Sequence, residues 1–490
     1  MPNRKNLTIL FLAFFALRLM FGLFRAQFRE TDQFQTYLIG LKTYTTGTWP
    51  WFGPDVNGME NSFKSQIPGA LEGLLIGLPF YLIPFPEAPF ILLNLLSLAG
   101  VALLTWYIVK RLPGISYIWL FIWIAVAPWS IHESTVMINP AFTFLPSILF
   151  FIAFMESLPF FTLNLVPERW ANAGMGFSLF WIMQFHFSYV YLVPLALFSL
   201  AFQALREKKW MAPVFFALGS LPMLALILPT YLKFGLARGN VAGGFAVPFN
   251  WGNVGEFWTI LARYLSLVSF EVPRFIGENT KSRLHFLGVE HPFLLVPGLL
   301  LWVIGLVQPF FLASVWFREL RLRFQWLFWA VFLGLCLLLA VSNWGDAAKS
   351  LSLSVGIMAI TLALGFWVGR LNPEKAGPQW KELNLLFSFV FAMVYASFWF
   401  TVKMPLSHIY FLFFPLLMTY SCYCWMTFRE KKAWRLAAKA FVILGVVFQV
   451  GFAIAVEPRD SIYPWWTAIK QAIDQKNYHL MGERRPESLY

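Results

Sequence analysis

The stretch "LTILFLAFFALRLMFGLFRAQFRETDQFQTYL", Leu7–Leu38, places a long apolar run directly before a polar segment that contains Asp32. A transmembrane helix needs about 20 mostly apolar residues, and the run from Leu7 to Phe24 is close to that length. Arg4 and Lys5 precede the run, and no small-residue cleavage site follows it. We therefore expect a retained first span with the N-terminus in the cytoplasm.

The rest of the chain has the same apolar character. Of 490 residues, 59% are hydrophobic and only 12% are charged, and the mean hydropathy is +0.64. These values predict an all-α polytopic membrane protein and exclude a sizeable soluble domain. The net charge of +13 is explained by basic cytoplasmic loops, so it does not indicate nucleic-acid binding. The three cysteines lie in apolar segments and are assigned no chemistry.

Thirteen segments are predicted to cross the membrane. They are residues 7–24, 88–109, 116–131, 141–157, 173–186, 188–205, 211–231, 293–317, 324–342, 351–369, 384–401, 408–427 and 436–456. With this count the clusters of Lys and Arg fall on the cytoplasmic side, as membrane proteins prefer. A further segment, residues 67–85, contains Glu72 and three prolines, so it is left on the outer face as a re-entrant or interfacial segment.

This threading predicts a transmembrane domain over residues 1–456 and an outer tail over residues 457–490. Two large outer loops, residues 25–87 and 232–292, interrupt the spans. In the tail, the segment "PWWTAIKQAI" places apolar residues at helical spacing, which is typical of a helix lying on the membrane surface. We expect function in these outer pieces.

Two interpretations of Asp32 follow from the residues alone. Thr31 or Asp32 can cap the helix that carries Phe34, Tyr37 and Leu38, which is an ordinary structural role. Alternatively, the Asp32 carboxylate is a general base, placed where the head group of a membrane-dissolved substrate meets an acceptor arriving from water.

The order of motifs resembles a known family. An Asp soon after the first span, then Tyr37, Gly47 and Trp49-Pro50, resembles the first outer loop of C-type (GT-C fold) glycosyltransferases. These form the superfamily of protein O-mannosyltransferases and lipid A aminoarabinose transferases. The proline-bearing segment, the span that ends in a basic pair, the second outer loop with Asn139-Pro140 and the short paired helices follow in the family's order over residues 1–210.

The resemblance implies a hexosyl- or pentosyltransferase that moves a sugar from a polyprenyl phosphate to a glycan, lipid or protein acceptor on the outer side of the membrane. Asp32 would act as the base or would position the acceptor hydroxyl. Tyr37, of the same loop, would belong to the acceptor or sugar pocket. The active site would face outward from a membrane, which we expect to be the bacterial inner membrane; endoplasmic reticulum topology is physically equivalent.

Departure of a phosphate needs positive charge nearby, because negative charge grows on the leaving group. The candidates for binding the donor phosphate are Arg29, Lys64, Lys403 and His408. Lys64 precedes the proline segment, although it is displaced from the position next to two prolines that relatives use. Lys403 and His408 lie in "KMPLSHIYFLFFP", which resembles the family's basic entry to a late span. The alternative for each cation is solvation at the membrane surface.

Four more polar residues are candidates for the acceptor or sugar pocket: His132, Glu133, Asn139 and His186. Glu133 is an alternative partner of Asp32 around a divalent ion, but no ligand spacing is diagnostic, so a metal is left open. Asn139 alternatively starts a span. His186 is alternatively a structural residue satisfied by Gln184 or Tyr189.

A transporter or flippase of a lipid-linked glycan is the alternative function. Such a protein is expected to place ionisable residues near the middle of the membrane. Here the acids concentrate in the outer loops, which favours chemistry at the membrane surface.

Overall fold

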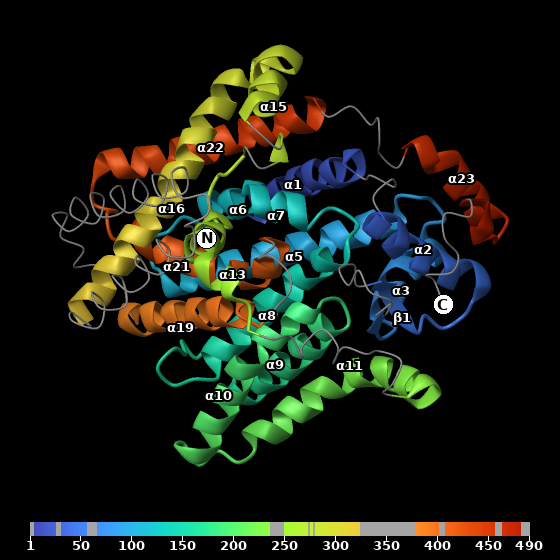
Figure 1. Cartoon of the computed structure of the whole chain (residues 1–490), viewed down its shortest axis with the longest axis horizontal. Coiled ribbons are helices and arrows are strands. Elements are labelled where there is room, and N and C mark those ends of the chain that lie inside the picture. Colours follow the sequence, from blue (N-terminus) through green and yellow to red (C-terminus); the bar gives the residue numbers. More distant parts are fainter. Residues whose placement is uncertain are drawn as a thin grey trace. The chain divides into compact units, whose positions relative to one another are not determined.

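The computed structural model describes residues 4–25, 31–55, 66–235, 249–272, 275–277, 280–323, 379–400, 407–455 and 463–481. Nearly all elements in these ranges are helical (Figure 1). They form two compact units, of which the first comprises residues 1–107, 116–244 and 449–490 and the second residues 108–115 and 245–448. Two helices, α5 (Ala88–Arg111) and α22 (Lys432–Ala455), contribute residues to both units.

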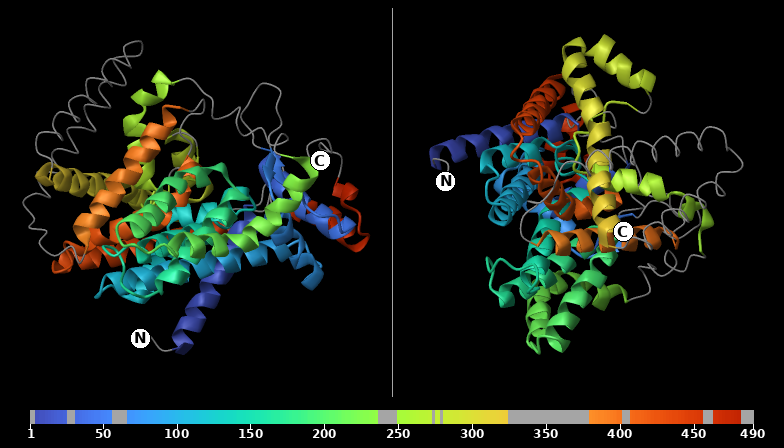
Figure 2. Two further views of the ribbon diagram at one scale, coloured as in Figure 1. Left: turned by 90° about the horizontal axis from the view of Figure 1, so that it is seen from below. Right: turned by 90° about the vertical axis from the view of Figure 1, so that its left-hand side faces the viewer.

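The first unit contains the N-terminal half of the chain and a late helix (Figure 2). Besides most of α5, its elements are α1 (Arg4–Phe24), α2 (Thr31–Thr46), β1 (Phe52–Asp55), β2 (Gln66–Pro68), α3 (Leu71–Gly77), α4 (Pro79–Leu82), α6 (Tyr117–Val126), α7 (Pro128–Glu133), η1 (Asn139–Thr143), α8 (Phe144–Glu156), α9 (Glu168–Met183), η2 (Phe187–Tyr191), α10 (Val193–Leu205), α11 (Ala212–Phe234), α23 (Tyr463–Asp474) and η8 (Tyr478–Met481).

The second unit is built around α16 and α19. Its elements are α13 (Trp251–Gly255), α14 (Phe257–Ser266), α15 (Thr280–His285), η5 (Phe286–Glu290), η6 (Pro292–Leu294), α16 (Leu295–Arg323), α19 (Trp380–Phe398), α20 (Ser407–Tyr410), η7 (Phe411–Phe413) and α21 (Phe414–Met426). The Trp316 indole donates to the Ser388 hydroxyl at 2.7 Å, and Tyr420 donates to Asn384 at 3.0 Å. These bonds satisfy polar groups inside an aromatic core.

Eight helical segments of the described part of the chain are long and apolar enough to cross a membrane. They are Leu7–Phe24, Ala88–Arg111, Asn139–Glu156, Phe187–Leu205, Ala212–Phe234, Pro292–Leu320, Trp380–Phe398 and Lys432–Ala455. Each matches a predicted span to within a few residues. The protein is therefore an integral membrane protein, as its hydropathy predicts.

The other predicted spans differ or lie elsewhere. The segment 116–131 is two helices, α6 and α7, because the chain is extended at Ala127 and Pro128 begins a new helix. The segments 173–186 and 408–427 contain helices shorter than a usual crossing, α9 and α21. Two spans, 324–342 and 351–369, lie outside the described residues. The count of thirteen and the sides of the two termini stay predictions.

The segment 67–85 contains no helix of the length needed to cross a membrane, and its place on the outer face stays a prediction. It forms α3 and α4, with Leu78 between them, and Pro79 starts the second helix. Its entry contradicts the all-α expectation in one detail, because β2 pairs antiparallel with β1 in a two-stranded sheet. Phe52 lies opposite Pro68 and Asp55 opposite Gln66, so β1 carries one extra residue, a bulge, between these pairs.

Two ionisable residues inside predicted spans have fixed structural partners in the first unit. Arg18 is fully buried and donates to Ser97 at 2.6 Å and to the Ala125 carbonyl at 2.7 Å. Glu156 accepts the Tyr107 hydroxyl at 2.8 Å and the backbone N–H of Leu165 at 3.0 Å. Buried charges are stable only with such partners, so both residues hold helices and loops together.

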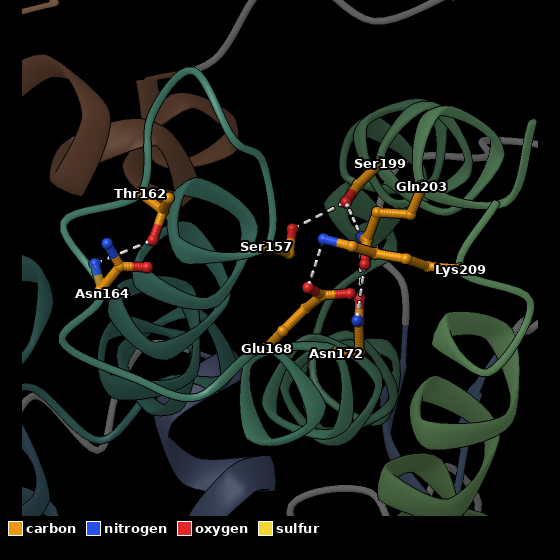
Figure 3. A network of polar contacts seen from close by, with 8 residues as sticks. All are labelled: Ser157, Thr162, Asn164, Glu168, Asn172, Ser199, Gln203 and Lys209. Carbon is orange, nitrogen blue, oxygen red and sulfur yellow. Dashed lines mark hydrogen bonds and ion pairs between the residues drawn. The ribbon is translucent and has the colours of Figure 1, made fainter. Parts of the chain in front are cut away.

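A row of polar side chains joins α8, α9 and α10 at one end of the first unit (Figure 3). Asn172 and Gln203 exchange two hydrogen bonds, at 2.8 and 3.0 Å. Ser199 contacts Gln203 at 2.9 Å and Ser157 at 2.7 Å. Polar groups buried between apolar helices favour one arrangement, because any other packing leaves them unpaired.

Helices α9 and α11 approach so closely that two glycines are required. A Cβ on Gly176 would lie 2.1 Å from the Phe216 carbonyl oxygen, and one on Gly219 only 1.9 Å from the Ala173 carbonyl oxygen. Small residues let the backbones of membrane helices touch, and this contact fixes α11 beside α9.

Candidate active site

Helix α2 carries the polar residues of the first outer loop. Asp32 lies in its first turn and is exposed, and a carboxylate there is favoured by the helix dipole. The side chains of Gln33, Gln35 and Thr36 are buried. The start of α2 therefore combines an accessible carboxylate with polar groups inside an otherwise apolar core.

Glycines seat α2 directly on α3. A Cβ on Gly40 would lie 2.3 Å from the Ile76 side chain, and one on Gly77 would lie 2.8 Å from the Gly40 carbonyl oxygen. One turn before Gly77 on α3, a Cβ on Gly73 would lie 2.4 Å from the Pro50 ring. The position of α2 is thus set by backbone contact rather than by long side chains.

Distant parts of the first unit hold the entry to α3. The Gln184 carbonyl oxygen accepts the Leu71 N–H at 3.3 Å, and its amide donates to the Met223 carbonyl at 3.3 Å. The Thr230 hydroxyl donates to the Trp51 carbonyl at 2.8 Å. The first loop, the end of α9 and helix α11 therefore meet at this point.

Helix α23 packs on the other side of α2, and Figure 1 shows the two helices side by side. The Trp466 indole donates to the Glu87 carboxylate at 2.9 Å. The Lys476 ammonium lies 3.2 Å from the centre of the Tyr44 ring. The apolar face of the late segment is buried in the same core as Tyr37, Leu41 and Tyr44, and it consists of Ile469, Ala472, Ile473 and Met481. The predicted amphipathic helix is confirmed, and its apolar face contacts protein.

Tyr37, predicted for the acceptor or sugar pocket, is fully buried. Its hydroxyl donates to the Pro86 carbonyl at 2.9 Å, and its ring meets Phe80 edge-on at 5.9 Å. Burial, aided by the charge of Glu87, raises the pKa of Tyr37 well above its ordinary value. The hydroxyl is therefore a fixed donor that ties α2 to the start of α5.

Replacing Tyr37 by Phe is expected to lower the free energy of unfolding by about 1–2 kcal/mol, because the buried Pro86 carbonyl loses its donor. Thermal unfolding followed by tryptophan fluorescence measures this loss. Donor consumption at a temperature where the variant is folded should be unchanged, and a large rise in the donor KM would show that Tyr37 contacts substrate instead.

Three of the other pocket candidates, His132, Glu133 and Asn139, belong to the second predicted outer loop. His132 is buried, with its ring 4.5 Å from that of Phe21 and 5.6 Å from that of Phe452. Glu133 follows it and is half-buried. Asn139 donates to the Phe185 carbonyl at 2.9 Å, which connects the second outer loop to the end of α9. The structure thus gives Asn139 a connecting role beside the core around α2.

His186 caps a short helix. Its Nδ1 lies 2.7 Å from the Ser188 hydroxyl and accepts the Ser188 N–H at 3.2 Å. Ser188 is a partner of the ring that the sequence reasoning did not name, and Gln184 makes hydrogen bonds to the backbone of Leu71 and Met223. The His186 ring therefore has a structural partner two residues away.

The structure does not describe the side chains of the predicted phosphate ligands. Arg29, Lys64 and Lys403 lie outside the described residues, as does the side chain of His408, which belongs to α20. Within the described ranges, no three His, Cys, Asp or Glu side chains form a group that could hold a metal ion. The role of a metal is untested.

Two residues near α2 were missed as site residues by the sequence reasoning. The sequence analysis used Glu72 only as an argument against counting residues 67–85 as a span. In the structure its side chain is fully buried beneath α2. Gln184 was considered only as a partner of His186. An acid in an apolar, proline-bearing segment was a signal for Glu72, whereas nothing local marks Gln184.

A comparison with protein-family models finds no match, and a comparison with curated proteins finds none either. Among solved structures, the chain is similar to the crystal structure of ArnT from Cupriavidus metallidurans bound to undecaprenyl phosphate. The TM-score is 0.38 at 12% identity, over 87% of this chain and 78% of that chain.

Proposed function

We propose that this protein is a membrane glycosyltransferase that takes a sugar from a polyprenyl-phosphate donor and transfers it to a hydroxyl acceptor at the outer surface of the membrane. The observation that carries this proposal is the exposed carboxylate of Asp32 on a helix whose other polar side chains in the first turns are buried. A base must reach its substrate and must be held still.

The proposed reaction is a single displacement at the anomeric carbon of the sugar, and it needs one general base from the protein. Asp32 takes the proton of the acceptor hydroxyl, the acceptor oxygen bonds to the anomeric carbon of the sugar, and the bond from that carbon to the phosphate oxygen breaks. The polyprenyl phosphate leaves with the electron pair of that bond. This scheme uses no nucleotide and no soluble domain, which fits the composition of the chain.

A cation and an aromatic ring lie together at the hairpin that follows α2. The Lys233 ammonium, in the last turn of α11, is 4.2 Å from the centre of the Trp51 ring. Phe234 meets Trp51 edge-on at 5.6 Å. An ammonium suits a phosphate, and an indole face suits a sugar ring. Lys233 therefore joins Arg29, Lys64, Lys403 and His408 as a proposed phosphate ligand.

The buried charges of the first unit favour a transferase over a transporter. Arg18 and Glu156 are tied to neighbouring helices and to backbone groups by short hydrogen bonds. Transporters need ionisable groups that change partners along a path. In the described part of the chain, the fixed hydrogen bonds of Arg18 and Glu156 are typical of residues with a structural role.

The test uses the full-length protein in lipid nanodiscs, with a panel of polyprenyl-phosphate sugars and with a simple glycan, a lipid and a peptide as acceptors. We expect release of polyprenyl phosphate from at least one donor, measured by mass spectrometry. In proteoliposomes, movement of the intact donor between leaflets without cleavage would contradict the proposal and would support a flippase.

A further inference from the structure

Glu72 is a buried acid that the proposed chemistry does not use. Its side chain has no exposed surface, and neither carboxyl oxygen has a hydrogen-bond partner within the described residues. Taking a carboxylate out of water is costly unless a cation or several donors replace the water. A residue kept at such a cost in the middle of an apolar segment needs an explanation.

The carboxyl lies in a narrow slot between α2 and β1. From α2, the fully buried Thr36 hydroxyl is the nearby side-chain group that lowers the pKa of the carboxyl. Neither Thr36 nor Glu72 makes a side-chain hydrogen bond of normal geometry within the described ranges. From β1, the backbone at Gly53 comes so close that a Cβ there would lie 2.7 Å from a Glu72 carboxyl oxygen. Gly53 lies within the bulged stretch of β1, so the strand bends where it meets the acid.

The surroundings of this slot keep the acid uncharged. Burial raises the pKa of Glu72 well above its ordinary value, and the Thr36 hydroxyl offsets only part of the rise. Among the described residues, burial and the Thr36 hydroxyl are the causes that act on this pKa. The titratable residues of the elements packed on α3 or on its entry are Asp32, Tyr37, Lys42 and Tyr44 of α2, Asp55 of β1, Tyr81 of α4, and Tyr231 and Lys233 of α11.

Several of these groups are engaged elsewhere. Tyr37 donates to the Pro86 carbonyl, and the Lys42 ammonium lies 5.8 Å from the Tyr478 ring. Tyr44 packs against Lys476 and Tyr81. Asp32 is exposed at the start of α2, one helical turn before Thr36 and on the same face.

We propose that Glu72 is a positioning residue of the active site: as an uncharged acid it holds β1 against α2, and it thereby fixes the helix turn that presents Asp32. This inference rests on the proposed role of Asp32. An uncharged carboxyl fits between Thr36 and Gly53, because among the described residues no cation and no hydrogen-bond donor pairs with the carboxyl oxygens of Glu72. Loss of the proton therefore drives β1 and α2 apart and displaces Asp32.

The first test measures thermal unfolding of the full-length protein in detergent between about pH 5 and pH 9, for the wild type and for Glu72→Gln. In the unfolded chain Glu72 loses its proton near its ordinary pKa of 4.5, whereas the folded protein retains the proton to a higher pH. Its contribution to stability is complete below the ordinary pKa and is lost as the pH rises toward the folded value.

We therefore expect the melting temperature of the wild type to fall relative to that of Glu72→Gln by on the order of 3 °C across this range. Thr36→Val removes the hydroxyl that favours the carboxylate, so its decline should extend to higher pH than in the wild type. Parallel curves for the wild type and Glu72→Gln would overturn the inference. Thr36→Val decides the same point if Glu72→Gln does not fold.

The second test follows donor consumption over the same pH range. We expect the wild-type kcat to fall at alkaline pH, and Glu72→Gln to keep its rate at neutral pH without that fall, with little change in KM. Gly53→Ala closes the slot sterically, so it should lower kcat at every pH.

The two proposals fail in different ways. A wild type that turns over with the same alkaline profile as Glu72→Gln contradicts the positioning role. If no variant consumes any donor but the melting curves diverge, the proposed transferase fails while Glu72 is still an uncharged acid that holds β1 on α2.

Discussion

Replacement of Asp32 by Asn is expected to lower the rate of donor consumption by about 10²–10⁴-fold, the contribution usual for a general base. The amide is nearly the same size as the carboxylate, but it cannot take a proton from the acceptor hydroxyl. Because the side chain is exposed at the start of α2, the fold should survive, and donor affinity should change little. Initial rates of polyprenyl phosphate release measure the effect.

The matched control is Glu87→Gln, an acid-to-amide change in the same outer loop. Glu87 accepts the Trp466 indole at 2.9 Å, and a glutamine oxygen can still accept it. We expect this variant to retain most of its activity. Equal rates for Asp32→Asn and the wild type would remove Asp32 from the reaction while leaving a transferase with another base.

Replacement of Gly219 by Ala is expected to destabilise the protein by about 3 kcal/mol or more. The added methyl group would lie 1.9 Å from the carbonyl oxygen of Ala173 and 2.5 Å from its Cα. These are backbone atoms of α9, so no side chain can turn aside and the two helices must separate. Separation also disturbs the contacts of Gln184 with α11 and α3.

Gly174, on α9, provides a control of opposite sign. A Cβ there would meet only the Ala153 methyl group, at 3.6 Å, which is ordinary contact. Because alanine favours a helix over glycine by about 1 kcal/mol, Gly174→Ala should be neutral or slightly stabilising. Thermal unfolding of the two variants decides the point, and similar melting temperatures would show that α9 and α11 are not in close contact.

Hydropathy predicts most of the helices of this protein. Spans such as α5 and α11 can be recognised because each is a long apolar run. Such a run is stable in the bilayer whatever the rest of the chain does, so it can be read from the local sequence. The break at Ala127 was missed, although Pro128 is in plain view, because apolar residues continue on both sides. The pairing of β1 with β2 was missed because the intervening segment gives no hairpin pattern.

The candidate site was predictable only in part. Asp32 was proposed from the order of motifs, and its side chain is exposed in the structure; its role stays a prediction. Tyr37 was expected in a pocket, but its hydroxyl is used by the Pro86 carbonyl. The roles of Gln184 and Glu72 depend on contacts between segments far apart in the chain, and single-sequence patterns report only neighbours. Burial converts both from unremarkable polar residues into fixed parts of the site.

The docking of α23 on α2 has a consequence for how the protein is made. Helix α23 is synthesised after every other α-helix that the structure describes, yet Ile469 and Ile473 belong to the core that surrounds Tyr37 and Leu41. A nascent chain therefore carries Asp32 long before the support for its helix exists. The core around Tyr37 and Leu41 is therefore completed only when the segment from Tyr463 to Met481 has been synthesised and has packed against α2.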